Sequence, residues 1–368
     1  MSTIDTSARA ARRLRDHRDD LARAANEAFL ERHPEWLERF GERARIHGEA
    51  DARFHVDFLA AALELSRPDP FRDYLTWTAH LLEQRGMAAA DLYEHLGDVA
   101  AAAGKWLPAA EQAQAESLAG DALRQAREAG PLDWGQPAGA LAVTASLYTE
   151  AALRGDRQAA RNLLEEALAQ GVDLRDLYVD VLQAAQYEVG RRWFENRITV
   201  AEEHMATVVT QAMLTQLYPR LPRPDVQRGR AVVTGVRNEL HQVGAHMVAD
   251  FLESDGWSVR FLGTQIPHEG IVSLVAREGL DLVGISVTMA TNLAAARELI
   301  EALRALDPGP RILVGGAAFR TNPGMWREFG AHGMASDLAG AVETARGLAT
   351  VAGDGAPNQR HQPGYGDK

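Results

Sequence analysis

AVVTGV at residues 231–236 is followed, two residues later, by ELHQVG at residues 239–244. The first stretch is a continuous apolar run typical of a buried parallel strand, and the second places a histidine on the loop that leads into a helix. In a doubly wound sheet this loop lies at the carboxyl ends of the strands, where such sheets bind ligands. A neutral imidazole there can coordinate a metal, which makes His241 the first candidate ligand.

The rest of the C-terminal part repeats the alternation of strand and helix that is typical of a parallel α/β sheet. Two further signals end expected strands, GISVT at 284–288 and ILVGG at 312–316. The sequence predicts a flavodoxin-like or Rossmann-like domain over residues 228–352. Its strands are expected at 230–236, 258–262, 281–287, 311–315 and, more briefly, 333–335, with helices near 242–254, 268–278, 293–306 and 337–350.

These three motifs together resemble the cobalamin-binding domain of methionine synthases, mutases and cobalamin-dependent photoreceptors. The pattern of that family is Asp-x-His-x-x-Gly, then a serine, then a Gly-Gly pair, and here Glu239 replaces the aspartate. The resemblance implies that His241 is the lower axial ligand of cobalt and that Glu239 orients its ring. The residues implied to contact cobalamin are Glu239, Leu240, Gln242, Val243, Gly244, Ser286, Val287, Thr288, Gly315, Gly316 and Phe319.

The glycines of these motifs have a physical reason in that family. A rigid nucleotide tail can approach the backbone only where no Cβ intrudes, and Gly244, Gly315 and Gly316 fit that role. The alternative for each single motif is a histidine that opens a surface helix, with ordinary turn glycines. Three motifs in order, each at the end of a strand, favour the cofactor site.

The N-terminal two thirds of the sequence predict helices only. Residues 1–130 have helical spacing with breaks at 67–70, Gly86 and Gly104, which predicts an all-helical domain. Residues 139–220, broken at Gly155, at 171–173 and near 196–197, predict a four-helix bundle. The turn-rich segment 130–137 is expected to be a linker, the proline-rich segment 219–224 a stiff connector, and residues 353–368 a disordered tail.

The bundle contains the stretch WFENRITVAEEH at 193–204. Thr199 and Glu202 have the spacing of a capping box, so a helix should begin there. Glu203 and His204 then lie about 100° apart around its axis, so they can address different partners. Without a cofactor, Trp193 would be a core aromatic residue at a helix end, and Glu203 would be a solvated acid beside a hydrogen-bonded His204.

This stretch looks like the Trp-x9-Glu-His signature of the light-sensing cobalamin module in coenzyme-B12-dependent transcriptional repressors. The resemblance implies a helical cap in which Trp193, Val200, Glu203 and His204 enclose a 5′-deoxyadenosyl group on the upper face of the corrin. In those repressors the residue after the tryptophan is a histidine that captures cobalt after illumination, and here it is Phe194. A phenyl ring cannot ligate a metal, so water or another side chain such as His204 must take that place.

Three N-terminal stretches, RFHVDFL at 53–59, PFRDYLTWTAHLL at 70–82 and RG at 85–86, resemble globin-like helical sensor domains. A globin-like domain ahead of a light-sensing cobalamin module is similar to the photocobilins, in which it holds biliverdin. Because the chain has no cysteine, such a bilin would be bound non-covalently. The alternatives are haem, or an empty domain that binds a partner protein. The candidate bilin residues are Arg53, His55, Arg72, Tyr74, Trp77 and His80.

Composition limits the other classes of function. The 368 residues include 46% hydrophobic and 24% charged residues with a net charge of -12, which argues against a surface for nucleic acid or anionic membranes. No basic recognition helix is evident in residues 1–130. The absence of cysteine excludes disulfides and thiolate metal sites. No apolar stretch matches a membrane span or a signal peptide, so we expect a cytoplasmic protein.

The sequence thus favours a non-enzymatic photoreceptor that carries adenosylcobalamin, and biliverdin as a second chromophore. We expect a homo-oligomer that changes its assembly state in light and signals to a separate protein. Two alternatives remain: a corrinoid carrier for methyl transfer, and a cobalamin-binding scaffold that does not respond to light.

Overall fold

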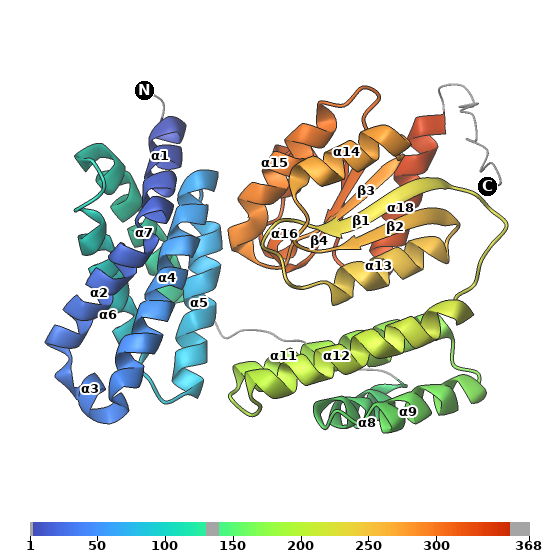
Figure 1. Ribbon diagram of the computed structural model, residues 1–368, viewed down its shortest axis with the longest axis horizontal. Coiled ribbons are helices and arrows are strands. Elements are labelled where there is room, and N and C mark those ends of the chain that lie inside the picture. The colour runs from blue at the N-terminus through green and yellow to red at the C-terminus, as the bar shows by residue number, and fades with distance from the viewer. Residues whose placement is uncertain (1–2, 130–139, 354–368) are drawn as a thin grey trace, which may run out of the picture.

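The computed structural model describes residues 3–129 and 140–353, which form three units (Figure 1). An N-terminal unit and a bundle are all helical, and a C-terminal unit combines helices with one sheet. The predicted linker 130–137 and the predicted disordered tail beyond Gly353 lie outside the described residues. Within the described ranges, no helix is both long enough and apolar enough to cross a membrane.

The sheet of the C-terminal unit confirms the predicted parallel arrangement. All neighbouring strands pair in parallel, in the order β2-β1-β3-β4-β5. The chain leaves β1 toward β2 on one side and returns to β3 on the other, so the loops after β1 and β3 meet at a topological switch point. The strands are β1 (Gly229–Gly235), β2 (Trp257–Gly263), β3 (Leu282–Ser286), β4 (Arg311–Gly315) and β5 (Gly333–Ala335).

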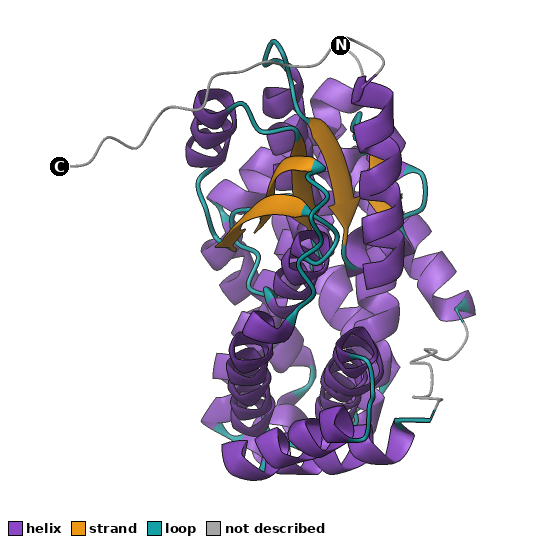
Figure 2. Ribbon diagram, turned by 90° about the vertical axis from the view of Figure 1, so that its right-hand side faces the viewer, coloured by secondary structure: helices purple, strands orange, loops and turns teal. Residues whose placement is uncertain are grey.

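Helices cover both faces of this sheet, as Figure 2 shows. One face packs against α13 (Val243–Glu253) and α18 (Leu338–Gly353). The other packs against α14 (His268–Glu278) and α15 (Leu293–Arg304), and against the short helices α16 (Ala317–Thr321) and α17 (Met325–Glu328). Because both faces are covered, the central strands carry consecutive buried apolar residues, such as 231–233 in β1 and 312–314 in β4, rather than an alternating pattern. A short turn, η3 (Ala290–Asn292), precedes α15.

The bundle breaks where the sequence predicts. Gly155 and Gly171 have positive φ angles at the ends of their helices, and the predicted capping box of Thr199 and Glu202 is confirmed. The core of the bundle includes Phe251 of α13, so the bundle lies on the α13 face of the sheet. Its elements are α8 (Ala142–Leu153), α9 (Arg157–Ala169), α10 (Leu174–Asp176), a π-helical segment η1 (Leu177–Gln183), α11 (Ala184–Phe194), α12 (Val200–Leu217) and η2 (Tyr218–Arg220).

A buried polar contact fixes the bundle on α13. The hydroxyl of Tyr178 donates to Oδ2 of Asp250 at 2.9 Å, and both side chains are buried. Burial raises the pKa of Asp250 to about 7, against the opposing effect of the Tyr178 hydrogen bond. Nε2 of His246 lies 3.8 Å from the other carboxylate oxygen, and Glu253 adds negative charge nearby.

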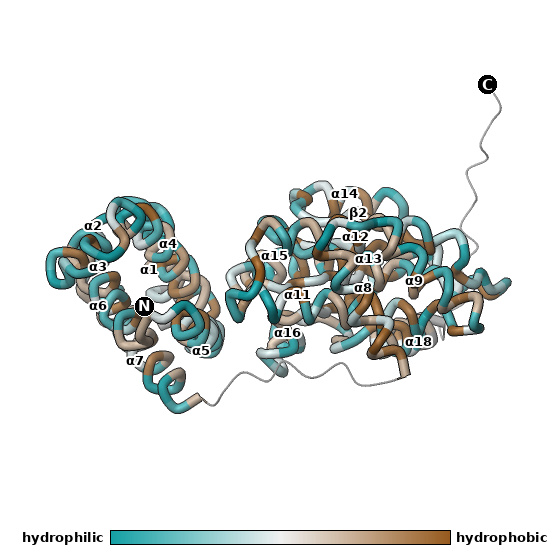
Figure 3. The backbone as a smooth tube through the Cα atoms, turned by 90° about the horizontal axis from the view of Figure 1, so that it is seen from below, coloured by the Kyte–Doolittle hydropathy of each residue, from teal (hydrophilic) through white to brown (hydrophobic). Residues whose placement is uncertain are grey.

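The N-terminal unit has its own core, against which Met289 and Ala290 of the C-terminal unit pack. It lies to one side of the rest of the chain in Figure 3. The predicted breaks at 67–70, Gly86 and Gly104 are present, and further breaks occur at His17, His33 and Gly41. The likeness to globins stays a prediction. Its helices are α1 (Thr3–Asp16), α2 (Arg18–Arg32), α3 (Pro34–Phe40), α4 (Glu42–Leu65), α5 (Asp69–Gln84), α6 (Ala89–Ala103) and α7 (Ala109–Glu128).

Candidate cofactor site

Glu239 and His241 form the centre of the candidate site, on the loop after β1. Oε1 of Glu239 accepts hydrogen bonds from the backbone amides of Leu240 and His241, each at 3.1 Å. The same oxygen lies 2.6 Å from Nδ1 of the His241 ring. This is the contact that the sequence predicts, with the carboxylate fixing the orientation of the imidazole.

The other carboxylate oxygen of Glu239 ties this loop to the loop after β3. Oε2 accepts from the backbone amides of Thr288 at 2.8 Å and Met289 at 3.1 Å, and from the side-chain amide of Asn292 at 3.1 Å. Six donors therefore converge on one fully buried carboxylate. The contacts of Met289 and Asn292 were not predicted, although a polar residue soon after an apolar strand was visible in the sequence.

The ionisation of Glu239 follows from these donors. Burial alone raises the pKa of the carboxyl, but the hydrogen bonds from His241 and the backbone, with the charge of the imidazole, outweigh it and lower the pKa to about 2. In the neutral tautomer that carries its proton on Nδ1, the ring donates to this carboxylate and Nε2 is free to bind a metal. The imidazole is 55% exposed, so a ligand can reach it from solvent.

The glycines of the site differ in their roles. A Cβ on Gly244, beside His241, would meet no atom within 4 Å, so the expected approach of a ligand to this backbone is sterically open. Gly316 has a φ of +96°, and a Cβ there would lie 2.2 Å from the carbonyl oxygen of Val287. The close approach at Gly316 is therefore internal packing of the β3 and β4 loops, which is a different reason from the expected nucleotide tail.

The remaining predicted cobalamin contacts divide between surface and core. Leu240 is 68% exposed beside the imidazole, and Gln242 and Val243 are half-buried at the start of α13. Ser286, Thr288 and Gly315 are also half-buried at the ends of β3 and β4. The side chains of Val287 and Phe319 are fully buried, and Phe319 packs edge-on against Phe329 in the core.

The cap residues lie at the end of α11 and along the first turns of α12. Val200 is 54% exposed and the side chain of His204 is 74% exposed. These two residues are four apart, and the next on the same stripe, Val208, is also exposed, so α12 leaves this stripe unpacked by the bundle. The sequence predicts that Glu203 and His204 address different partners. In the structure they contact each other, with Nδ1 of His204 2.5 Å from Oε2 of Glu203.

Trp193 contacts the N-terminal unit. Its ring stacks on Trp77 of α5, with centroids 5.9 Å apart and planes 25° apart, and the guanidinium carbon of Arg85 lies 5.8 Å from the Trp193 centroid. The buried Phe194 packs against the same Trp77. Neither Arg85 nor the stack was predicted, because these residues are far apart in the sequence and meet only through tertiary packing.

Comparisons with known proteins agree with this geometry. Residues 229–344 match the model of a family described as a B12 binding domain, and residues 145–218 match a second model with the same description. The two matches support cobalamin binding by residues 145–344, which we call the B12-binding module.

The module has relatives in two groups. A corrinoid protein of Desulfitobacterium hafniense is 28% identical over 53% of this chain and 93% of its own length. The HTH-type transcriptional repressor CarH of Myxococcus xanthus is 29% identical over 48% of this chain, and the match spans 58% of the repressor. The solved monomethylamine corrinoid protein of Methanosarcina barkeri shares the fold, with a TM-score of 0.52 and 23% identity over 57% of this chain and all of that chain.

The six candidate bilin residues of the N-terminal unit all have partners in the described part of the chain. His55 and Tyr74 are buried and joined by a contact of 2.6 Å between Nδ1 and the hydroxyl. Burial lowers the pKa of His55, which keeps the ring neutral. The others have separate partners: Arg53 pairs with Asp19 and Glu49, Arg72 with Asp69 and Asp73, Nδ1 of His80 lies 2.7 Å from the Thr76 carbonyl oxygen, and Trp77 stacks on Trp193.

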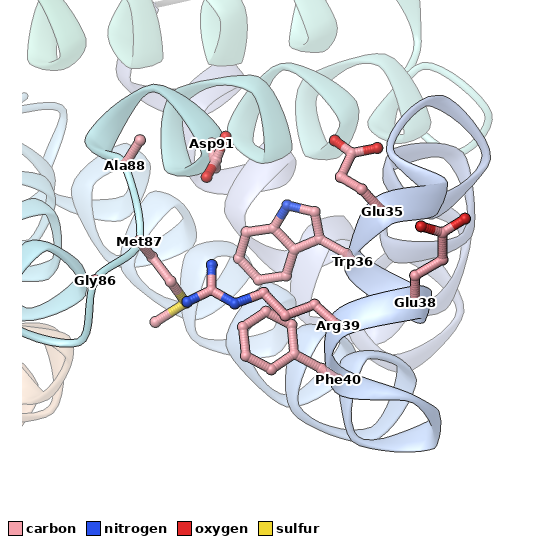
Figure 4. Close-up of a pocket in the computed structure, with 9 residues that line it drawn as sticks. All are labelled: Glu35, Trp36, Glu38, Arg39, Phe40, Gly86, Met87, Ala88 and Asp91. Atoms are coloured by element: carbon pink, nitrogen blue, oxygen red, sulfur yellow. The ribbon is translucent and has the colours of Figure 1, made fainter.

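A pocket of about 590 Å³ opens elsewhere in this unit, between α3 and the loop before α6 (Figure 4). Trp36 and Phe40 form its aromatic wall, and the guanidinium of Arg39 lies over Phe40. None of the six candidates lines it. Its three carboxylates outnumber its one guanidinium, so this pocket does not fit the two propionates of a bilin.

Proposed function

We propose that this chain is a light sensor that holds adenosylcobalamin between the β1 loop and the helical bundle. The observation that carries the proposal is the exposed stripe of Val200 and His204 on α12, at the distance from Trp193 along the sequence that the light-sensing signature has. The similarity to the repressor CarH supports it. The bundle leaves an apolar side chain and an imidazole exposed on this face. Covering such a surface with an adenine ring is more favourable than leaving it in contact with water.

His241 would hold cobalt through Nε2, with Glu239 fixing the ring. The open backbone at Gly244 and the exposed side chain of Leu240 would adjoin the corrin and its tail. When bound, adenosylcobalamin supplies the photochemistry, because light breaks its cobalt–carbon bond and releases the adenosyl group. Phe194 cannot ligate the metal, so we propose His204, or water, for the upper face after illumination.

The protein response would come from contacts that differ between the dark and lit states. Val200, Glu203 and His204 would contact the adenosyl group in the dark state and lose it after illumination. Loss of those contacts frees the α11–α12 end to move, and Trp193 carries that movement to Trp77. We expect a change of oligomeric state and a signal to a separate protein, without an enzymatic output.

The test is reconstitution in the dark with adenosylcobalamin, followed by absorption spectra and size-exclusion chromatography before and after green light. We expect the alkyl-cobalt band to bleach and the elution volume to change. The His241→Ala variant should lose the spectrum of imidazole-bound cobalamin, whereas Gln216→Ala, at the exposed far end of α12, should behave as wild type. An unchanged elution volume after complete bleaching would refute the sensor.

The second candidate is a corrinoid carrier for methyl transfer, favoured by the 93% coverage of the Desulfitobacterium corrinoid protein. A carrier must admit a second protein to the upper face of its cofactor, and a sensor must enclose the adenosyl group. The two differ in ligand preference. If the protein is a sensor, Val200→Trp should weaken binding of adenosylcobalamin but not of methylcobalamin, because the new side chain fills the place of the adenosyl group. If it is a carrier, the substitution should change the affinity for both ligands equally.

Biliverdin in the N-terminal unit is a separate proposal that rests on the likeness to photocobilins. The buried His55–Tyr74 contact and the neighbouring ring of His95 offer polar groups within an apolar core. Titration with biliverdin tests it: a red-shifted band that His55→Ala abolishes would support a bound pigment. Free biliverdin after gel filtration would contradict it.

A further inference from the structure

A second pocket, of about 380 Å³, lies at the opposite end of the sheet from His241. Of its lining residues, Arg228 directly precedes β1 and Asp255 lies two residues before β2, which places the pocket at the amino ends of the strands. Arg175 belongs to the bundle, Arg223 to the connector and Arg346 to α18. Three separate parts of the chain therefore meet around one small cavity.

The pocket is strongly cationic in an acidic chain. Four guanidinium groups and one carboxylate line it, whereas the whole sequence has a net charge of -12. The buried Asp255 engages two of the arginines: Nε of Arg228 lies 2.8 Å and Nε of Arg346 2.9 Å from its carboxylate oxygens. Asp255 thus pairs with Arg228 and Arg346. The other two arginines, Arg175 and Arg223, have no carboxylate partner among the residues that line the pocket.

Those two arginines have unused donors. Nη2 of Arg175 donates to the carbonyl and hydroxyl oxygens of Ser254, at 3.0 and 3.1 Å, but its Nε is buried and has no hydrogen-bond partner. A buried donor left unpaired costs free energy, which a ligand can recover. Arg223 is exposed and lies over Tyr218, with no ion pair to a carboxylate in the described part of the chain.

We propose that this pocket binds a small anion that carries a diphosphate or triphosphate group. Guanidinium groups match phosphate oxygens in paired hydrogen bonds, and an excess of three positive charges suits a multiply charged ligand better than a single carboxylate. The volume is in the range of small-molecule sites. Because Arg175 and Arg346 come from different units, the anion ties the bundle to the sheet. This inference does not depend on the proposed light response.

The test is calorimetric titration of pyrophosphate into the cobalamin-loaded full chain. We expect saturable binding to one site that weakens as salt is added. Arg175→Gln and Arg223→Gln should each weaken binding about tenfold, as expected for one charge-assisted hydrogen-bond donor. The control is Arg220→Gln, which lies on the same connector but pairs with Glu165 at 2.7 Å outside the pocket, and should keep wild-type affinity.

Arg228 and Arg346 are unsuitable targets, since their loss would leave Asp255 buried without a partner. If Arg175→Gln fails to fold, Arg223→Gln decides alone, because that side chain is exposed. Absence of saturable binding at millimolar pyrophosphate overturns the proposal, and so does equal weakening by Arg220→Gln. Binding of a polyglutamate peptide without binding of pyrophosphate would mean a protein-docking surface and would also overturn it.

Discussion

Replacement of Glu239 by glutamine tests the centre of the site. The carboxylate accepts six hydrogen bonds, three on each oxygen, and donates none. A glutamine has nearly the same shape, but one of its two positions is an amide nitrogen. Whichever way the amide is turned, three donors then face another donor. The variant therefore removes acceptors without creating a cavity.

The expected loss is about 3 kcal/mol of the free energy of unfolding at pH 7. This figure follows from the fall of the Glu239 pKa from 4.5 to about 2 on folding, because each pKa unit corresponds to about 1.36 kcal/mol. A lowered carboxyl pKa contributes its full stabilisation above pH 4.5, so pH 7 is the right condition. The carboxylate is fully buried, but the His241 side chain that lowers its pKa is 55% exposed, so solvent screening makes this figure an upper value.

Urea denaturation followed by circular dichroism measures this loss. The chain has several units, so the relevant transition is the one that added cobalamin shifts. Glu298→Gln is the matched control, because Glu298 is 53% exposed and its ion pairs with Arg237 and His268 are 3.8 and 3.9 Å long. The control should change stability by less than about 0.5 kcal/mol. An equally small effect of Glu239→Gln would refute the account of the loop.

Three further predictions follow from packing and burial. Gly316→Ala should destabilise the B12-binding module by about 2 kcal/mol or more, as measured by thermal melts. Gly244→Ala should leave the stability of the apo protein unchanged but weaken cobalamin binding, as measured by titration. Asp250 stays protonated in the folded state up to about pH 7, whereas in the unfolded state it loses its proton near pH 3.8. The free energy of unfolding of the wild type should therefore fall as the pH rises from 3.8 to 7. Asp250→Asn should make this free energy, measured by urea unfolding, depend less on pH. Trp77→Ala should weaken the contact between the N-terminal unit and the cap by about 1 kcal/mol, seen as faster proteolysis between the units and altered Trp193 fluorescence.

Local patterns predicted the elements of the sheet well, and the contacts between loops poorly. The apolar run before Glu239 marked β1 to within two residues. The resemblance of the Glu-x-His motif to cobalamin-binding domains implied the contact between Glu239 and His241. Asn292 was missed because it is 53 residues from Glu239, and the two meet only because β3 lies beside β1. The helix break at His17 also went unpredicted, since no glycine or proline marks it.

The N-terminal unit gives the strongest reason to treat the chain as one coupled system. Its α5 presents Trp77 to the cap tryptophan, Trp193, and its core packs against Met289, whose backbone amide binds Glu239. It therefore touches both the helix end above the proposed cofactor and the loop that orients the ligand below. Any state of the N-terminal unit that favours one arrangement of these contacts must change cofactor affinity, and by linkage the cofactor must favour that state by the same factor. Trp77→Ala should therefore change both the affinity for adenosylcobalamin in the dark and the response to light. If neither changes, the two units are not coupled through this contact and bind their ligands independently.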